Sequence, residues 1–168
     1  MVLTKSELIA SLQKEVRILV HLAGKIDRTM IDYRPTPGQR STLELLRYLS
    51  IMGPGLVQAA QAGGFDFAVW TAAQKESETR DFDQTVAVIA AQSDLYAKVL
   101  GGMSDADFRA EMNSFDGSKV SKGSFIVNLV LSGHAAYRTQ LFLYLKARGR
   151  EELSTYNLWQ GVDAPAAV

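Results

Sequence analysis

The sequence of 168 residues has no cysteine, only two histidines and no excess of charge of either sign. Without cysteine, the chain has no thiol nucleophile, no disulfide and no thiolate ligand for zinc or an iron–sulfur cluster. Two histidines cannot supply a three-histidine metal site within one chain. The 18 basic residues balance 18 acidic ones, and this lack of a basic excess disfavours a role in binding nucleic acid.

The sequence also lacks a long apolar run. The stretch 125–131 is interrupted by Asn128 and is far too short to cross a bilayer. The first fifteen residues carry charges where a signal peptide has its apolar region. We therefore predict a cytoplasmic protein without membrane contact. The length suits one folded domain, which we place over residues 1–160, with a C-terminal tail over 161–168, where helical periodicity is missing.

Four long segments have apolar residues at the three-and-four spacing of a buried helix face. Capping-box patterns mark the starts of the first two, and Pro54 predicts a kink or a break inside the second. The four segments predict an all-α protein built as a four-helix bundle. They span residues 4–30, 41–62, 81–101 and 124–147.

The connections between these segments differ in length. The middle connection, 63–80, is long and is expected to hold a short helix around 67–74. After the third segment, Ser104 and Asp107 form a capping pattern for another short helix. The pair Asp116-Gly117 then predicts the turn of a small hairpin. With connections this unequal, the bundle need not have a simple up-down topology.

The motifs of common enzyme classes are missing. Neither His21 nor His134 follows a glutamate at the spacing of a Glu-x-x-His di-iron ligand pair. The sequence contains no phosphate-binding loop and no Gly-x-Ser-x-Gly nucleophile elbow. An ordinary hydrolase, kinase or dehydrogenase mechanism therefore has no residues to carry it.

Two segments resemble the DinB-like superfamily of small bacterial helical bundles. The stretch DYRPTPGQRSTLELLRYL, residues 32–49, is similar to the entry into that family's second helix. The stretch GHAAYRTQLFLYLKARG, residues 133–149, resembles its last helix, and Arg138, Gln140 and Leu141 match the Arg-x-Gln-Leu pattern there. The resemblance implies a four-helix bundle over most of the chain. It also implies a nickel or zinc ion held by three histidines, with thiol-transferase or thiol-dependent isomerase activity in several members.

The residues at the three implied ligand positions are not histidines. The helix-two position falls on Tyr48, and the two last-helix positions fall on Gly133 and Tyr137. Tyrosine is a poor ligand for nickel or zinc at neutral pH, because its hydroxyl has an ordinary pKa of about 10. We therefore predict no cofactor and no metal site, with nickel or zinc binding as the alternative.

Four residues are candidates for a ligand-binding site that remains where the metal site would be: Tyr48, His134, Tyr137 and Gln140. His134 lies one residue from an implied ligand position, about 100° around a helix, and a helix bulge would turn it inward. We expect Tyr48, Tyr137 and His134 to form a polar cluster, with Gln140 and Arg138 as nearby hydrogen-bond partners. His134 is also the candidate for a catalytic base.

Three functions remain open from the sequence. The first is binding of a small molecule in the remnant site. The second is a divergent metal- or thiol-dependent transferase that uses His134. The third is a dimeric structural or stress-associated interaction protein without catalysis. A homodimer is predicted from Leu8, Ile18 and Leu22, which flank the main apolar stripe of the first helix.

The sequence also predicts the surroundings of three further residues. His21 falls in a stripe of basic residues that should face solvent. Trp70 and Trp159 are expected to be packing residues, and Trp70 is also a candidate for the mouth of a pocket.

Overall fold

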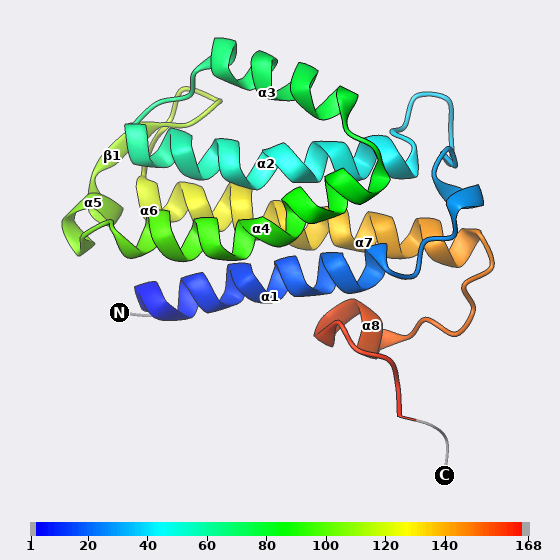
Figure 1. Cartoon of the computed structure of the whole chain (residues 1–168). Helices are drawn as coiled ribbons and strands as arrows, with labels where there is room; N and C mark the ends of the chain where they lie inside the picture. Colours follow the sequence, from blue (N-terminus) through cyan, green and yellow to red (C-terminus); the bar gives the residue numbers. More distant parts are fainter. Residues whose placement is uncertain (1–2, 166–168) are drawn as a thin grey trace.

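The computed structural model describes residues 3–165, so the first two residues of the predicted domain and the last three of the predicted tail lie outside the described residues. The chain is mostly helical, and four long helices form a bundle (Figure 1). The predicted all-α four-helix bundle is confirmed. The four helices are α1 (Lys5–Ala23), α2 (Thr42–Ala62), α4 (Phe82–Gly101) and α7 (Ser132–Ala147).

The order of helices around the bundle is not the order along the chain. α1 and α2 lie at opposite corners, and each packs against both α4 and α7. α2 and α4 run in the same direction, because α3 (Phe67–Thr79) returns the chain across the outside of α2 (Figure 1). The long middle connection therefore contains a crossover helix, and the topology is not simple up-down.

Short elements join α4 to α7 and follow α7. The predicted short helix after Ser104 and the predicted hairpin are both present, and Gly117 at the hairpin turn has a φ of 80°. This left-handed conformation favours glycine. The short elements are the 3₁₀ turn η1 (Arg28–Met30), α5 (Asp105–Arg109), β1 (Glu111–Asn113), β2 (Lys119–Ser121), α6 (Lys122–Phe125), the π-helix η2 (Ile126–Leu131) and α8 (Thr155–Gln160).

Two predicted boundaries are wrong, and the predicted alternative of a break at Pro54 is wrong as well. α1 ends at Ala23 rather than Met30, and the next turn is a separate 3₁₀ turn capped by the side chain of Asp27. α3 continues to Thr79, five residues beyond the prediction. α2 is one continuous helix across Pro54. The proline removes one helical hydrogen bond, but residues on both sides of it are buried in the core, and this packing holds the helix together.

The fourth predicted helix is divided by η2, a π-helix. Its wider turns hold more residues than those of an α-helix, so they rotate the residues that follow around the helix axis. The hydroxyl of Ser132 donates to the carbonyl of Val127, five residues earlier, at 3.1 Å. His134 follows directly, and its side chain is fully buried.

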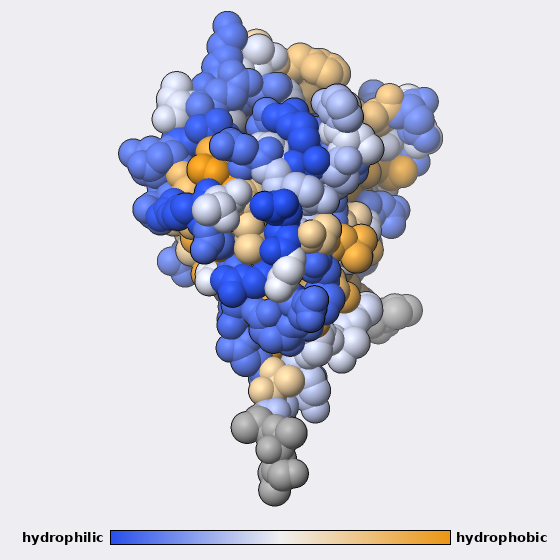
Figure 2. Space-filling model, turned by 90° about the vertical axis from the view of Figure 1, so that its right-hand side faces the viewer, coloured by the Kyte–Doolittle hydropathy of each residue, from blue (hydrophilic) through white to orange (hydrophobic). Residues whose placement is uncertain are grey.

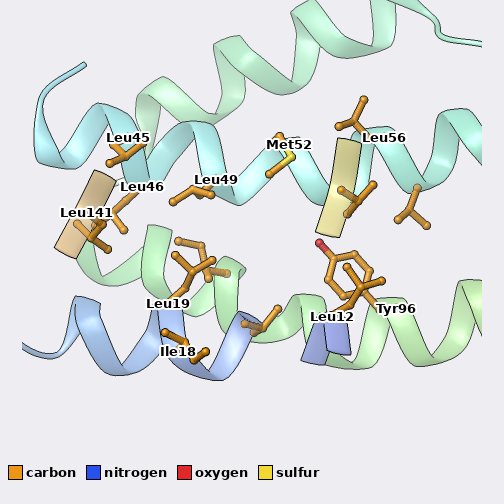
Figure 3. Close-up of a cluster of buried hydrophobic side chains, with 14 of the residues drawn as sticks. Leu12, Ile18, Leu19, Leu45, Leu46, Leu49, Met52, Leu56, Tyr96 and Leu141 are labelled. Atoms are coloured by element: carbon orange, nitrogen blue, oxygen red, sulfur yellow. The ribbon is translucent and has the colours of Figure 1, made fainter. Parts of the chain in front are cut away.

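The core is a layer of aliphatic side chains between α2 and the helices opposite it (Figure 3). The hydroxyl of Tyr96, from α4, points towards α2 within this layer. Burial of each large apolar side chain contributes roughly 1.5–3 kcal/mol to the free energy of unfolding. The fully buried set includes Leu12 and Leu19 from α1, Leu45, Leu46, Leu49 and Met52 from α2, and Leu141 from α7.

The C-terminal segment packs on the bundle from residue 155 to residue 163. Arg138 of α7 forms a buried ion pair with Glu15 of α1, at 2.7 Å between Nε and Oε2. The Arg138 guanidinium also donates to the carbonyl of Leu158 and lies 4.9 Å from the ring centre of Trp159. Arg138 therefore joins α1, α7 and α8. Trp159 is 57% exposed, so the expectation that it is a packing residue is wrong.

The surface proposed for a homodimer lies inside the chain. Leu8, Ile18 and Leu22 are all buried, and Gly161 packs directly over Ile18, leaving no room for a Cβ atom. These leucines and isoleucine are core residues. They therefore no longer support the predicted homodimer. The end of the bundle seen in Figure 2 is mostly hydrophilic, with only scattered hydrophobic residues.

The C-terminal segment also covers part of the basic stripe on α1. His21 is half-buried, and its Nε2 lies 3.0 Å from the side-chain amide of Asn157. Lys25 pairs with Asp163 at 2.6 Å. The stripe is therefore partly paired within the chain rather than fully solvated.

Candidate functional site: an aromatic groove beside a buried tyrosine–histidine network

Tyr48 of α2 and Tyr137 of α7 lie together, as predicted. Their ring centres are 5.0 Å apart, with the rings nearly perpendicular. The guanidinium of Arg40 lies 4.0 Å from the centre of the Tyr48 ring. Burial and the neighbouring Tyr137 raise the pKa of Tyr48 to about 12. Tyr48 therefore keeps its proton at neutral pH, and its neutral hydroxyl can both donate and accept a hydrogen bond.

A cavity of about 570 Å³ opens beside the two tyrosines. Its walls come from α2, from the start of α3, from η2 and α7, and from the hairpin, so residues far apart in the sequence form one site. We call it the tyrosine groove. It is lined by Tyr48, Met52, Leu56, Phe65, Phe67, Trp70, Phe115, Asn128, Leu129, Ser132, Gly133, Ala136 and Tyr137.

Aromatic rings form the outer wall of the tyrosine groove. The Phe65 ring lies 4.9 Å from Phe67, 4.9 Å from Phe115 and 5.5 Å from Trp70, measured between ring centres. Trp70 continues the wall to Tyr48, at 6.2 Å. Phe67 is 70% exposed and Phe115 is 56% exposed. Exposed aromatic rings beside a cavity are typical of a surface that binds another molecule.

The third implied metal-ligand position is filled by a methionine. Gly133 faces the tyrosine groove, and a Cβ atom at this position would come within 3.2 Å of the Met52 methyl group and 3.3 Å of its sulfur. The thioether of Met52 therefore occupies the space beside Gly133.

His134 does not line the tyrosine groove. Its Nε2 lies 2.7 Å from the hydroxyl of Tyr96, a residue of α4 that is also fully buried. The predicted cluster of Tyr48, Tyr137 and His134 is therefore wrong for His134, whose polar partner comes from the opposite corner of the bundle. The periodicity of α7 could not identify that partner, because Tyr96 appears in the sequence as one more apolar-face aromatic.

The hydrogen bonds of this buried network define the tautomer of His134. The side-chain amide of Gln92 donates to the carbonyl of Leu49 at 2.9 Å, so its oxygen faces Tyr96. The Tyr96 hydroxyl donates its one proton to that oxygen, at 2.9 Å. Tyr96 must then accept from His134, which carries its proton on Nε2. Within residues 3–165, Nδ1 of His134 has no hydrogen-bond partner.

Burial keeps His134 neutral. With its side chain removed from water, the pKa of His134 falls to about 4. Burial likewise raises the pKa of the Tyr96 hydroxyl far above its ordinary range. The pair is therefore uncharged at neutral pH and is held by neutral hydrogen bonds.

The sequence Gly53-Pro54-Gly55 makes room for two large side chains on opposite sides of α2. A Cβ atom at position 53 would lie 1.8 Å from the Tyr96 hydroxyl and 2.8 Å from Nε2 of His134. At position 55 it would lie 3.1 Å from the ring of Trp70. The two glycines therefore allow the buried network and the groove wall to approach the same turn of α2.

Gln140 supports the tyrosine groove from outside it. Its side-chain amide donates to the hydroxyl of Tyr144, which donates to the backbone carbonyl of Arg40 at 3.0 Å. Arg40 in turn lies over Tyr48. Gln140 therefore helps to hold Arg40 rather than facing the cavity.

The residues present do not fit the nickel or zinc ion that the DinB-like resemblance implies. Gly133 offers no ligand atom, Tyr48 holds its proton, and His134 is bonded to Tyr96. In the part of the chain that the structure describes, no three His, Asp or Glu side chains are placed to hold a metal ion together. No helix of residues 3–165 is long and apolar enough to cross a membrane.

The fold is that of known DinB-like proteins. A DinB-like protein from Bacillus subtilis, YjoA, is 17% identical, with a TM-score of 0.69 over 89% of this chain and 96% of that one. YfiT from Bacillus subtilis, described as a probable metal-dependent hydrolase with an unusual four-helix bundle topology, is 13% identical, with a TM-score of 0.69 over 86% of this chain and 87% of that one. No family model and no curated protein matches the sequence. The chain is therefore a DinB-like four-helix bundle by its fold.

Proposed function

We propose that the protein binds a small, planar, largely apolar molecule in the tyrosine groove. The observation that carries the proposal is the meeting of Tyr48, Tyr137 and Trp70 on a cavity of about 570 Å³. That volume lies within the range of small-molecule sites. The aromatic walls favour a flat apolar ligand, and the tyrosine hydroxyls supply one or two hydrogen bonds to orient it.

The hydrolase description of YfiT does not extend to this proposal. A metal-dependent reaction needs ligand atoms for the metal, and the three ligand positions that the DinB-like resemblance implies hold two tyrosines and a glycine in this chain. The alternative transferase that uses His134 needs this side chain to reach a substrate, but His134 is fully buried and bonded to Tyr96. We therefore favour binding without a catalytic role for His134.

The proposal is tested by titrating the protein with indole in a calorimeter. Indole is flat and apolar and has a single N–H group, so it matches the walls and the hydroxyls of the groove. We expect saturable binding of one indole per chain. Ala136→Trp should abolish it, because Ala136 is an exposed residue of the groove and the larger ring would fill the cavity.

The variant Tyr48→Phe distinguishes a groove that binds a ligand from one in which the tyrosines only fill the space of the implied metal site. If the groove binds ligand, the variant keeps its ring packing and its stability, but loses a hydrogen bond and binds indole roughly three- to tenfold more weakly. If the tyrosines only fill the vacated site, the variant loses roughly 1–3 kcal/mol of stability, and the native protein binds no indole. Tyr156→Phe is the matched control, because Tyr156 is exposed on α8 and should change neither quantity.

A further inference from the structure

A second cavity lies on the other side of α3 from the tyrosine groove. It has a volume of about 530 Å³, is open to solvent and is bounded by α2, α3 and α4. Residues of α3 form the roof of this space and residues of α2 and α4 form its floor. α3 lies across the outside of α2, on which it packs (Figure 1). Phe65 and Trp70 belong to the walls of both cavities, so the two spaces adjoin at these rings. We call this space the α3 cavity.

Small side chains create the α3 cavity. Its floor and roof contain Ala59, Ala73 and Ala91, one from each of the three helices. Larger aliphatic residues complete the wall, and one of them, Val69, is 57% exposed to solvent. An apolar space of this size, with an exposed valine in its lining, favours an apolar occupant.

The lining residues of the α3 cavity are spread along α3. They run from Asp66, which caps the start of α3, to Arg80, which follows its end. A helix of this length spans about 20 Å. This length therefore suits an unbranched chain better than a compact molecule.

One end of the α3 cavity carries a positive charge held in a fixed place. The carbonyl of Arg80 accepts from Nε of Arg47 at 2.9 Å, which anchors the backbone between α3 and α4. The Arg80 guanidinium donates to the hydroxyl of Ser50, a buried residue of the cavity floor, at 3.1 Å. Its side chain is only 16% exposed.

The guanidinium of Arg80 has capacity for a further acceptor. In residues 3–165 its side-chain hydrogen bonds go to Ser50 and to Glu76, which leaves three of its five N–H groups. The Glu76 side chain is 71% exposed, and such ion pairs contribute little. A carboxylate inside the cavity could therefore bind Arg80 beside Glu76 or in its place. At the far end of the cavity, the Asp66 carboxylate accepts hydrogen bonds from two backbone N–H groups of α3. Asp66 is not positively charged, so it does not compete with Arg80 for the carboxylate of a ligand.

We propose that the α3 cavity binds the anion of an unbranched fatty acid, with its carboxylate on Arg80 and its chain along the alanine-lined floor beneath α3. The site is separate from the tyrosine groove, and the proposal does not depend on indole binding there. A fatty carboxylate satisfies both the apolar walls and the single guanidinium. The neutral alcohol of the same chain length satisfies only the walls.

The test is calorimetric titration with decanoate and with decanol, below the concentrations at which either one aggregates. We expect one decanoate per chain, bound at least tenfold more tightly than decanol. Arg80→Gln should remove this difference by weakening decanoate alone. Arg109→Gln, a change at an exposed arginine of α5, should leave both affinities unchanged.

Cavity-filling variants locate the chain of the ligand. Ala91→Phe and Ala73→Phe place a ring in the α3 cavity from two different helices, at positions that are not fully buried. Each should abolish decanoate binding while indole binding is kept, and Ala136→Trp should have the opposite effect. Circular dichroism and urea unfolding verify that each variant is folded.

Several results would overturn the proposal. They are the absence of decanoate binding, equal affinity for decanoate and decanol, equal weakening by Arg80→Gln and Arg109→Gln, and competition between decanoate and indole for one site. The last would assign the anion to the tyrosine groove. Loss of indole binding alone would contradict the proposed function and leave the α3 cavity proposal standing.

Discussion

At the scale of single residues, the buried network of Gln92, Tyr96 and His134 is the most demanding part of the structure. It places three polar side chains in an apolar core, and a buried polar group without a partner costs roughly 1–3 kcal/mol. Each is bonded to the next, and Gln92 is bonded to the backbone of α2. The network therefore specifies how α2, α4 and α7 meet.

Stability should fall in acid because of His134. Its pKa is about 4 in the folded chain, against 6.5 for an ordinary histidine. Between these values the unfolded chain binds a proton that the folded chain excludes. The contribution of His134 to the free energy of unfolding is therefore fully present above pH 6.5. It is lost as the pH falls from 6.5 towards 4, and the total loss is about 3 kcal/mol.

Urea unfolding across that pH window measures the effect. His134→Gln keeps an N–H donor for Tyr96 but does not titrate, so its stability should depend less on pH than that of the native chain. His21→Gln is the matched control, because burial also lowers the pKa of His21, but less of its side chain is buried. Equal pH dependence in the native chain and in His134→Gln would show that His134 is not buried in its neutral form.

Gly53→Ala should destabilise the protein. The new Cβ atom would overlap the Tyr96 hydroxyl, so α2, α4 or the network must shift, at a cost of about 1–3 kcal/mol or more. Gly101→Ala in α4 is the control, since nothing lies within 4 Å of its Cβ position. There alanine should stabilise the helix by up to about 1 kcal/mol. Thermal unfolding of both variants compares them, and equal effects would mean that α2 and Tyr96 are not in close contact.

At the scale of elements, local patterns predicted most of the bundle but not how its parts meet. The capping boxes at Thr4 and Ser41 gave correct helix starts, because a cap is made by residues three positions apart. Apolar spacing located the four long helices, because this spacing also depends only on residues three or four positions apart. The meeting of Tyr48 and Tyr137 followed from the DinB-like resemblance rather than from spacing.

Other features depend on contacts between distant residues, which sequence spacing does not report. The six residues of α8 have too few turns to show a stripe, and its position depends on Arg138 and Glu15, 123 positions apart in the chain. The π-helix before α7 changes the register of His134, and apolar periodicity alone did not reveal Tyr96 as its partner. The continuity of α2 across Pro54 is likewise decided by packing on both sides of it.

The ion pair between Glu15 and Arg138 should be costly to break from one side. Glu15→Ala leaves a buried guanidinium without its carboxylate and should lower the free energy of unfolding by about 3–5 kcal/mol. The double variant Glu15→Leu with Arg138→Met replaces both charges by apolar groups and should recover most of that loss. Urea unfolding measures both. A small effect of Glu15→Ala would mean that water reaches the pair.

At the scale of the whole molecule, α3 borders two cavities of similar size with different chemistry. The tyrosine groove has aromatic walls and neutral hydroxyls, and the α3 cavity has aliphatic walls and one arginine. Trp70 lines both of them and packs against Gly55. The crossover helix, which gives the bundle its unusual order of helices, thereby forms a wall of each site.

Protein purified without a histidine tag should not contain nickel or zinc at one ion per chain. The expectation follows from the poor donor set at Tyr48, Gly133 and Tyr137. Elemental analysis by mass spectrometry measures the metal content, with a known zinc protein as the control. One tightly held ion per chain, lost in His134→Ala, would revive the transferase alternative.

Nuclear magnetic resonance is the most direct test of our proposal that a tyrosine-lined groove binds a ligand at the positions where the DinB-like resemblance implies a metal site. The measurement is a titration of tyrosine-labelled protein with indole, following the ring signals of individual tyrosines. We expect the signals of Tyr48 and Tyr137 to shift together and to saturate at one indole per chain, while the signal of Tyr156 stays unchanged. If Tyr48 and Tyr137 do not respond, or respond no more than the exposed Tyr156, the claim is contradicted.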